Sequence, residues 1–239
     1  MGRSDATRKI SNYVAFPRTD ETVKQRRARA RRIIRELREL YPDADSALNR
    51  NSALQLLIST ILSAQSTDQT VNRVATKLFA RYPTAEALAQ ADREELESLI
   101  HATGFFRQKA KSLKGMAQRL VDEFGGQVPN NMDDLLTLPG VARKTANVVL
   151  GTWFKKNEGV VVDTHVGRLS HRMRLTWRSK DGKDAVKIEQ DLVEILPRKQ
   201  WTYVGHALIR HGRKICTARK PSCGACTLSK HCPSAGTFD

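Results

Sequence analysis

Apolar residues recur at helical spacing along most of this chain, and this feature constrains its fold more than any other. They return every three or four positions, which places them on one face of a helix. Examples are Leu54, Leu57, Ile58, Ile61, Leu62, Val71, Val74, Leu78, Leu113, Met116, Leu120, Leu192, Leu196, Val204 and Leu208. The one strand-like stretch, Val160–Val162, is too short and isolated to found a sheet. The pattern predicts an all-α protein, and 239 residues are enough for a sizeable core.

The four cysteines are confined to the C-terminal end, with six, two and five residues between successive members: Cys216, Cys223, Cys226 and Cys232. A disulfide-bonded secreted protein would spread its cysteines through the fold, so this clustering indicates a metal site. Four thiolates can hold zinc or a [4Fe–4S] cluster. Zinc sites favour two close cysteine pairs and only one CxxC occurs here, so the spacing favours iron–sulfur slightly and leaves both open.

The net charge of +16, from 41 Lys and Arg against 25 Asp and Glu, indicates a polyanionic partner, of which nucleic acid is the commonest inside cells. A solubilising surface or a ribosome-associated protein would have the same balance. A basic run from Lys24 to Arg32 leads into a helical pattern, whose polar face is either solvated or in contact with phosphate. No apolar run is long enough to span a membrane, so we expect a soluble, cytoplasmic, nucleoid-associated protein.

The segment DDLLTLPGVARKTANVVLG (133–151) predicts two short helices that meet at a tight turn. Pro139-Gly140 breaks the helical spacing, which resumes at Arg143. Because Gly140 and Ala142 have little or no side chain, a phosphate could approach their backbone N–H groups at the positive end of the second helix. That contact would grip DNA without reading its sequence. Many helical hairpins turn at Pro-Gly and bind nothing, so the turn alone favours DNA only modestly.

Lys144 and Asp163 are the two candidate catalytic residues. Lys144 falls in the first turn of the second hairpin helix, where the helix dipole, and any burial, disfavours its ammonium form. A neutral amine can form a Schiff base with a sugar aldehyde. By local sequence alone, a plain phosphate contact is the better interpretation of Lys144. Asp163 opens a helix and is by default its N-cap, unless the fold brings it close to Lys144.

Several motifs together resemble the helix-hairpin-helix glycosylases, and more closely the endonuclease III family of DNA repair enzymes. They are LLISTILSAQSTDQTVN (56–72), LPGVARKTANVVL (138–150), VDTHVGRLSHR (162–172), ALIRHGR (207–213) and the four cysteines. The similarity extends from about residue 53 to residue 232 with the motifs in the right order, which makes the match specific.

The resemblance implies a bifunctional DNA glycosylase and AP lyase that acts on oxidised or ring-saturated pyrimidines and abasic sites. It assigns the nucleophile to Lys144 and the catalytic carboxylate to Asp163. Lys144 forms a Schiff base with a sugar whose nucleotide is flipped out of the duplex, and β-elimination then cleaves the strand. The cysteine spacing matches the family's [4Fe–4S] cluster. Gln65 corresponds to the glutamine that fills the gap in the stack, and further DNA contacts are expected from Phe105, Leu138, Gly140, Ala142, Arg143 and His165.

Three positions depart from the family's usual pattern. Ala142 replaces the second hairpin glycine, Phe105 in GFFRQK (104–109) stands where leucine is common, and Gly167 replaces a bulkier side chain. An aromatic residue stacks on bases more strongly, so these changes bear on substrate range. They also leave open a non-catalytic damage-binding paralogue of the same fold, and a zinc-stabilised nucleic-acid protein is a weaker third alternative.

We expect two helical domains with the active site in the cleft between them. Residues 46–156 form a central helical domain that holds Gln65 and the hairpin. Residues 157–239, with Asp163 and the cysteines, form the iron–sulfur domain, and residues 1–45 pack with it. Residues 1–20 lack apolar periodicity and are expected to be a flexible lead. The expected partner is damaged double-stranded DNA, bound by a monomer.

Overall fold

The computed structural model describes residues 21–237, and none of these residues lies in a β-strand. The all-α prediction is therefore confirmed, while the expected flexible lead at residues 1–20 lies outside the described residues. The α-helices and 3-10 helices (η) are α1 Val23–Leu40, α2 Ala53–Leu62, α3 Asp68–Arg81, α4 Ala85–Ala89, α5 Arg93–Ile100, η1 His101–Thr103, α6 Phe106–Phe124, α7 Met132–Thr137, α8 Arg143–Thr152, α9 Thr164–Arg172, α10 Ala185–Ile195, η2 Arg198–Gln200, α11 Trp201–Lys214, η3 Cys223–Ala225 and η4 Thr227–His231.

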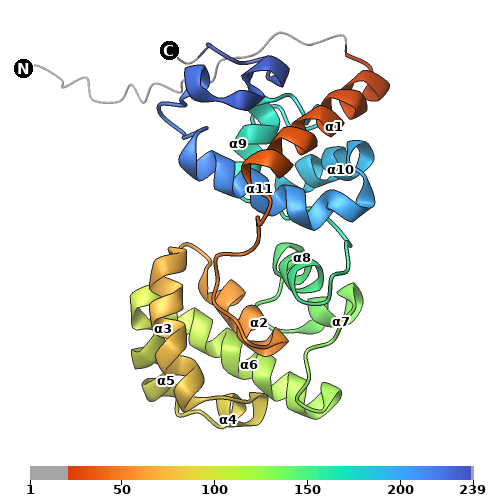
Figure 1. Cartoon of the computed structure of the whole chain (residues 1–239). Coiled ribbons are helices and arrows are strands. Elements are labelled where there is room, and N and C mark those ends of the chain that lie inside the picture. Colours follow the sequence, from red (N-terminus) through yellow and green to blue (C-terminus); the bar gives the residue numbers. More distant parts are fainter. Residues whose placement is uncertain (1–20, 238–239) are drawn as a thin grey trace, which may run out of the picture.

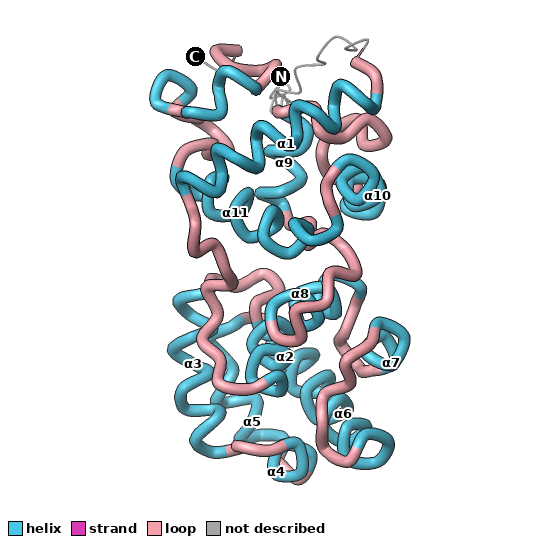
Figure 2. Tube along the Cα trace, turned by 45° about the vertical axis from the view of Figure 1, so that its right-hand side comes forward, coloured by secondary structure: helices cyan, strands magenta, loops and turns pink. Residues whose placement is uncertain are grey.

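The helices form two lobes, as Figures 1 and 2 show. The lower lobe contains α2 to α8 around one hydrophobic cluster, and the upper lobe contains α1, α9 to α11 and the cysteine segment around a second one. The chain crosses between the lobes at residues 41–52 and 153–163. The domain boundaries expected at 45/46 and 156/157 fall within these crossings, and we propose on the basis of the two cores that each lobe is a domain.

The strand-like stretch Val160–Val162 is an extended crossing segment rather than part of a sheet. Successive side chains of an extended chain point in opposite directions. Val161 accordingly packs into the lower cluster, whereas Val160 and Val162 pack into the upper one. The same alternation that makes the stretch look like a strand thus lets it join the two cores.

Side-chain caps define where the helices begin. Thr22 and Gln25 form a reciprocal capping box at the start of α1, and Ser52 caps α2 by accepting a hydrogen bond from the Gln55 N–H. Part of the basic run in α1 is structural, because Arg29 is buried and donates to the Met173 carbonyl oxygen at 2.6 Å. The exposed arginines of α1 remain on its solvent face.

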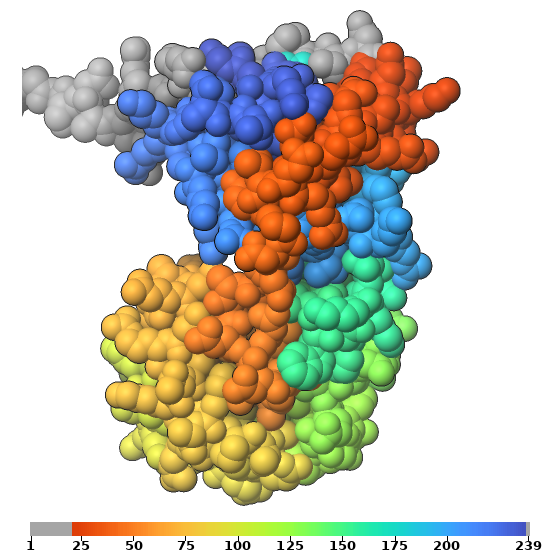
Figure 3. Space-filling view, in the orientation of Figure 1, coloured from red at the N-terminus to blue at the C-terminus, as the bar shows by residue number. Residues whose placement is uncertain are grey.

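The two lobes meet at a waist (Figure 3), where polar contacts join them. The Thr152 hydroxyl at the end of α8 lies 3.0 Å from His206 Nε2 on α11, and Arg213 of α11 pairs with Asp68 of α3 at 2.6 Å. None of the described helices is both long and apolar enough to cross a membrane.

Candidate active site and DNA interface

The hairpin turn between α7 and α8 requires glycine at position 140. Gly140 has a φ of +79°, and a Cβ atom there would lie 2.8 Å from Ser112 Cβ on α6. The left-handed backbone and the close approach each disfavour any other residue. Ala142 is the N-cap of α8 and provides no side-chain hydrogen bond, so the first N–H groups of the helix are available to an anion. The substitution of alanine for the second hairpin glycine is accommodated, since the backbone of Ala142 is extended.

Lys144 lies in the first turn of α8 on the lower lobe, and its side chain is exposed. Its neighbours on the same helix are anchored: Arg143 Nε lies 3.0 Å from Glu189 Oε2, and Asn147 Nδ2 donates to Glu189 Oε1 at 2.9 Å. Glu189 belongs to α10 of the upper lobe. The free protein therefore presents the lysine to solvent from a helix whose orientation is fixed by the other lobe.

Asp163 is the N-cap of α9 on the upper lobe, as the local sequence predicts. Its Oδ1 atom accepts hydrogen bonds from the backbone N–H groups of His165 at 2.9 Å and Val166 at 2.8 Å. The side chain is half-buried. Because one carboxylate oxygen accepts both capping bonds, the carboxylate is fixed in orientation at the head of the helix.

His165 lies between Asp163 and the cysteine segment. Its Nδ1 atom is 3.1 Å from Arg168 Nη2, which also donates to the Cys216 carbonyl oxygen at 3.0 Å. Burial lowers the pKa of His165, while the negative charge of Asp163 acts in the opposite direction. His165 therefore favours the neutral imidazole and is linked through Arg168 to the cysteine segment.

Gln65 and Phe105 are exposed residues in two turns of the lower lobe. Gln65 follows the end of α2 with a φ of +54°, and Phe105 precedes α6 with a φ of +48°. Left-handed conformations are uncommon for residues other than glycine and occur often at functional sites. The Phe105 side chain is 65% exposed, which is unusual for phenylalanine and suits a residue that stacks on bases.

The four cysteines are free thiols that surround one small apolar pocket together with Met173, His211, Ile215, Pro221 and Leu228. Within residues 21–237 no group of three or more His, Cys, Asp or Glu side chains is arranged to hold a single metal ion. Burial raises the pKa of the Cys226 and Cys232 thiols, so a bound cation is needed to favour their thiolates. Four thiols around one shared space fit a cluster that each of them ligates.

Comparison with known proteins identifies the family. Residues 58–198 match the model of the HhH-GPD superfamily of base excision DNA repair proteins, and residues 216–232 match the iron–sulfur binding domain of endonuclease III. Endonuclease III of Synechocystis sp. is 52% identical over 88% of this chain and 94% of its own length. The chain belongs to the endonuclease III family. It is a base excision repair enzyme, and its cysteines hold a [4Fe–4S] cluster.

Other members of the endonuclease III family extend the match. The Haemophilus influenzae protein is 40% identical over 84% of this chain and 92% of its own length. A solved structure of a trapped endonuclease III–DNA covalent intermediate superposes with a TM-score of 0.82 at 35% identity, covering 88% of this chain and 97% of that one. The all-α, helix-hairpin-helix expectation is thus confirmed.

Two cluster ligands of this endonuclease III family member have nitrogen atoms beside their sulfurs. Arg172 Nη1 donates to Cys216 Sγ at 3.3 Å, and His211 Nε2 lies 3.4 Å from Cys226 Sγ. The other ring nitrogen of His211 is 3.1 Å from the Tyr41 hydroxyl. Burial lowers the pKa of His211 to about 4, so its imidazole is neutral at physiological pH. Such bonds orient ligands and tune an iron–sulfur centre.

The structure shows the surroundings of two positions that the sequence singled out, Leu138 and Gly167. The Leu138 side chain is only 2% exposed and belongs to the lower core, so we propose that the DNA contact expected at this position is made by its backbone. At Gly167, a Cβ atom would lie 2.3 Å from the Gly182 carbonyl oxygen. The missing side chain therefore makes room for the loop before α10 and leaves no enlarged pocket.

The sequence reasoning missed two residues that hold the site together, Glu189 and Lys109. Glu189 gives no local sign of its contacts with α8, because they cross between the lobes. The sequence does contain a sign for Lys109. This residue precedes Leu113 by four positions and so falls on the apolar stripe of α6, where a lysine is unexpected. Both side chains are buried.

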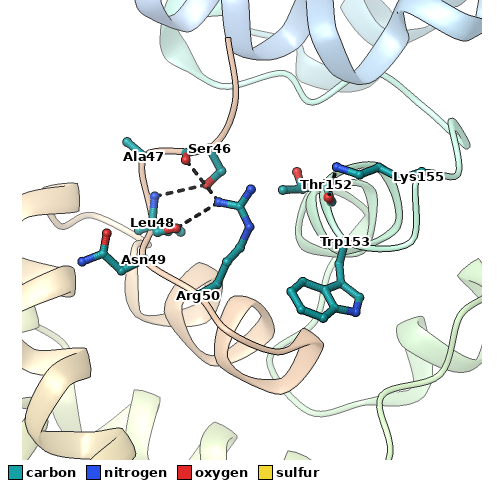
Figure 4. A pocket seen from close by; sticks show the side chains of 8 residues that line it. All are labelled: Ser46, Ala47, Leu48, Asn49, Arg50, Thr152, Trp153 and Lys155. Carbon is teal, nitrogen blue, oxygen red and sulfur yellow. Dashed lines mark hydrogen bonds between the residues drawn. The ribbon is translucent and has the colours of Figure 1, made fainter. Parts of the chain in front are cut away.

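A pocket of about 500 Å³ lies at the waist, beside Thr152 at the C-terminal end of α8 (Figure 4). Arg50 and Trp153 border it, and Arg50 Nη1 donates to the carbonyl oxygens of Ser46 and Leu48. Lys144 and Thr152 are eight residues apart, about 12 Å along a helix. The pocket therefore belongs to the crossing segments and not to the mouth of the hairpin.

Proposed function

We propose that this protein is a bifunctional DNA glycosylase and AP lyase in which Lys144 is the nucleophile and Asp163 its carboxylate partner. The observation that carries the proposal is the placement of an exposed lysine at the head of the uncapped hairpin helix α8. Phosphates bound at the N–H groups of that helix would bring the sugar chain beside the lysine. The cap geometry of Asp163 supports a fixed carboxylate on the opposite lobe.

The reaction begins when the damaged nucleotide is turned out of the duplex. DNA that covers the exposed amine excludes water from it, and Asp163 accepts the proton that the Lys144 amine gives up. The Nζ lone pair then attacks C1′. The bond from C1′ to the base breaks, and the base leaves with that electron pair and takes up a proton.

Strand cleavage follows from the same covalent intermediate. The amine proton moves to O4′ as the sugar ring opens, which leaves an imine between Lys144 Nζ and C1′. Removal of a C2′ proton sends its electron pair toward C3′, and the bond to the 3′ phosphate breaks. Water then hydrolyses the imine and restores the free lysine.

The proposed substrates are oxidised or ring-saturated pyrimidines and abasic sites in double-stranded DNA. Gln65 and Phe105 would enter the duplex where the nucleotide leaves, and an aromatic side chain stacks there more strongly than leucine. Arg143, Ala142 and Gly140 would contact the backbone, and His165 would line the pocket near Asp163. We further propose that the protein acts as a monomer at the nucleoid, in keeping with its net charge of +16.

Borohydride trapping on abasic and thymine glycol duplexes tests this proposal. The wild-type protein should form a covalent adduct and nick both substrates, and Lys144→Gln should abolish both results. Lys77→Gln, which removes an exposed lysine on α3, is the matched control and should behave as the wild type. Binding without nicking by the wild type would instead support the damage-binding paralogue, an alternative that the family match does not favour.

A further inference from the structure

Lys109 is a buried lysine whose amine joins two separate parts of the lower lobe. The residue is 5% exposed and lies in the first turn of α6. Its Nζ atom donates to the Leu62 carbonyl oxygen at 2.8 Å and to the Thr103 carbonyl oxygen at 2.8 Å. A buried cation is costly unless its hydrogen bonds are made, so these two bonds account for its position.

The two acceptors stand directly before the two turns that carry Gln65 and Phe105. Leu62 is the last residue of α2, three residues before Gln65. Thr103 is the last residue of η1, two residues before Phe105. Both turns continue into a left-handed residue that is not glycine, with φ values of +54° and +48°. The ammonium group of Lys109 thus anchors the residues at which both turns begin.

The electrostatics of this anchor are favourable at both acceptors. The Leu62 carbonyl is among the last four of α2, which have no partner within the helix and carry its negative dipole end. The Thr103 carbonyl ends the short helix η1. Desolvation lowers the pKa of Lys109, and carbonyl oxygens at helix ends oppose that effect by favouring the cation.

We propose that Lys109 is a positioning residue that fixes the spacing between Gln65 and Phe105, so that the two side chains enter a DNA duplex as one pre-formed pair. The inference rests on the proposed function, which places both residues in the duplex. Without the two hydrogen bonds of Lys109, each turn would have to be ordered separately when DNA binds, and the entropy cost of this ordering would weaken the affinity for DNA.

The anchoring of both turns by Lys109 should affect duplex and single-stranded substrates differently. In a duplex the damaged nucleotide must be turned out and the gap that it leaves must be filled. The reaction on duplex DNA therefore requires Gln65 and Phe105 at the correct spacing. A single-stranded oligonucleotide with an abasic site has no opposing base and no gap to fill. Lys109 should therefore matter for duplex substrates only, while the chemistry of Lys144 is unchanged on both.

Single-turnover trapping of the iron–sulfur-loaded Lys109→Met variant tests the proposal. The substrates are one abasic oligonucleotide used alone and as a duplex with 2-aminopurine opposite the lesion. We expect the trapping rate at subsaturating protein to fall at least tenfold on the duplex and less than twofold on the single strand. The 2-aminopurine fluorescence change that reports stacking at the gap should shrink. Lys77→Met removes the same charge from α3 and should change neither rate.

A double variant adds a second criterion. If Lys109 acts through Phe105, then Lys109→Met combined with Phe105→Ala should be no slower on the duplex than the slower single variant. If Lys109→Met fails to fold, a second cycle tests the proposal with Gln65→Ala, Phe105→Ala and the double variant of these two. Because Lys109 links the two turns, the losses of trapping rate on the duplex should be coupled rather than additive. Additive losses in either cycle, or equal loss on both substrates, would overturn the proposal. Absence of any wild-type adduct would contradict the proposed function instead.

Discussion

Glu189 and Arg143 form an ion pair at 3.0 Å that joins α10 of the upper lobe to α8 of the lower lobe. The other carboxylate oxygen of Glu189 accepts a hydrogen bond from Asn147, one turn further along α8. A Cβ atom at Gly159 would lie 2.0 Å from Glu189 Oε1, so the crossing segment packs directly against this carboxylate. The N-terminal half of the helix that presents Lys144 is thereby held by Glu189 of the opposite lobe, while His206 contacts its C-terminal end.

Removal of Glu189 should destabilise the protein through Asn147 more than through Arg143. The Arg143 side chain is 52% exposed, so solvent screens the ion pair, whereas the Asn147 amide is buried. Glu189→Ala leaves the buried Asn147 amide without its hydrogen-bond acceptor and should lower the free energy of unfolding by about 1–3 kcal/mol. Glu189→Gln keeps an acceptor for Asn147 and should cost less than about 1 kcal/mol. Urea unfolding measures both. Glu158→Ala, which breaks an exposed pair with Arg198, is the control, and an equal loss in Glu189→Gln and Glu189→Ala would contradict this account.

Gly140→Ala should disrupt the hairpin. Alanine is strained at a φ of +79°, and its Cβ would meet Ser112 Cβ at 2.8 Å. We expect a loss of more than about 1 kcal/mol of stability, from the strained backbone together with the steric clash. DNA affinity should weaken as well, because the turn that would hold phosphate is displaced. Gly224→Ala, where no atom lies within 4 Å of the added Cβ, should be close to neutral. Thermal unfolding and duplex binding of the two variants make the comparison, and similar effects at both positions would count against it.

Asp163→Asn should separate the two roles of Asp163. Asparagine caps helices about as well as aspartate, so both bonds to the head of α9 can be kept and stability should change by less than about 0.5 kcal/mol. The side chain loses its negative charge and can no longer accept a proton, so single-turnover base removal should fall at least about 100-fold. A stable variant with nearly normal base removal would leave Asp163 with its capping role alone.

His206 should make stability depend on pH. Burial lowers its pKa from the ordinary value of 6.5, with Asp45 opposing, and its Nε2 lies 3.0 Å from the Thr152 hydroxyl. Since the native state favours the neutral ring, the contribution of His206 is complete above pH 6.5 and is lost as the pH falls below it, by at most about 1.4 kcal/mol per pH unit. Urea unfolding between pH 5 and 8 measures the free energy of unfolding of the wild type and of His206→Gln. The difference between the two should become smaller as the pH falls. A constant gap would contradict the assignment.

The elements of this fold were accessible from sequence because helical periodicity is local. The stripes around Leu57, Leu113 and Leu208 each became a buried helix face. Val160–Val162 shows the limit of that reasoning, because alternation in an extended segment does not tell whether its two faces meet a sheet or two separate cores. The cap role of Asp163 was likewise predictable from its position before a helix.

The candidate site could be predicted only in part, since its residues come from distant segments. Local sequence favoured a phosphate contact for Lys144, and only the motif resemblance singled out its amine as a nucleophile. The Leu138 side chain fills the lower core, a role that the motif resemblance did not indicate. The contacts of Glu189 and Lys109 join elements 42 and 47 residues apart, and no local pattern specifies such partners.

The identity of the nucleophilic amine is the central claim, and peptide mapping of the borohydride-reduced adduct tests it most directly. A reduced adduct on Lys144 blocks trypsin at that position, so digestion should place the modified sugar on the peptide formed by residues 144–155, KTANVVLGTWFK. Fragmentation should locate the added mass on its first residue. A modified sugar on any other lysine, or on the N-terminal amine, would contradict the account.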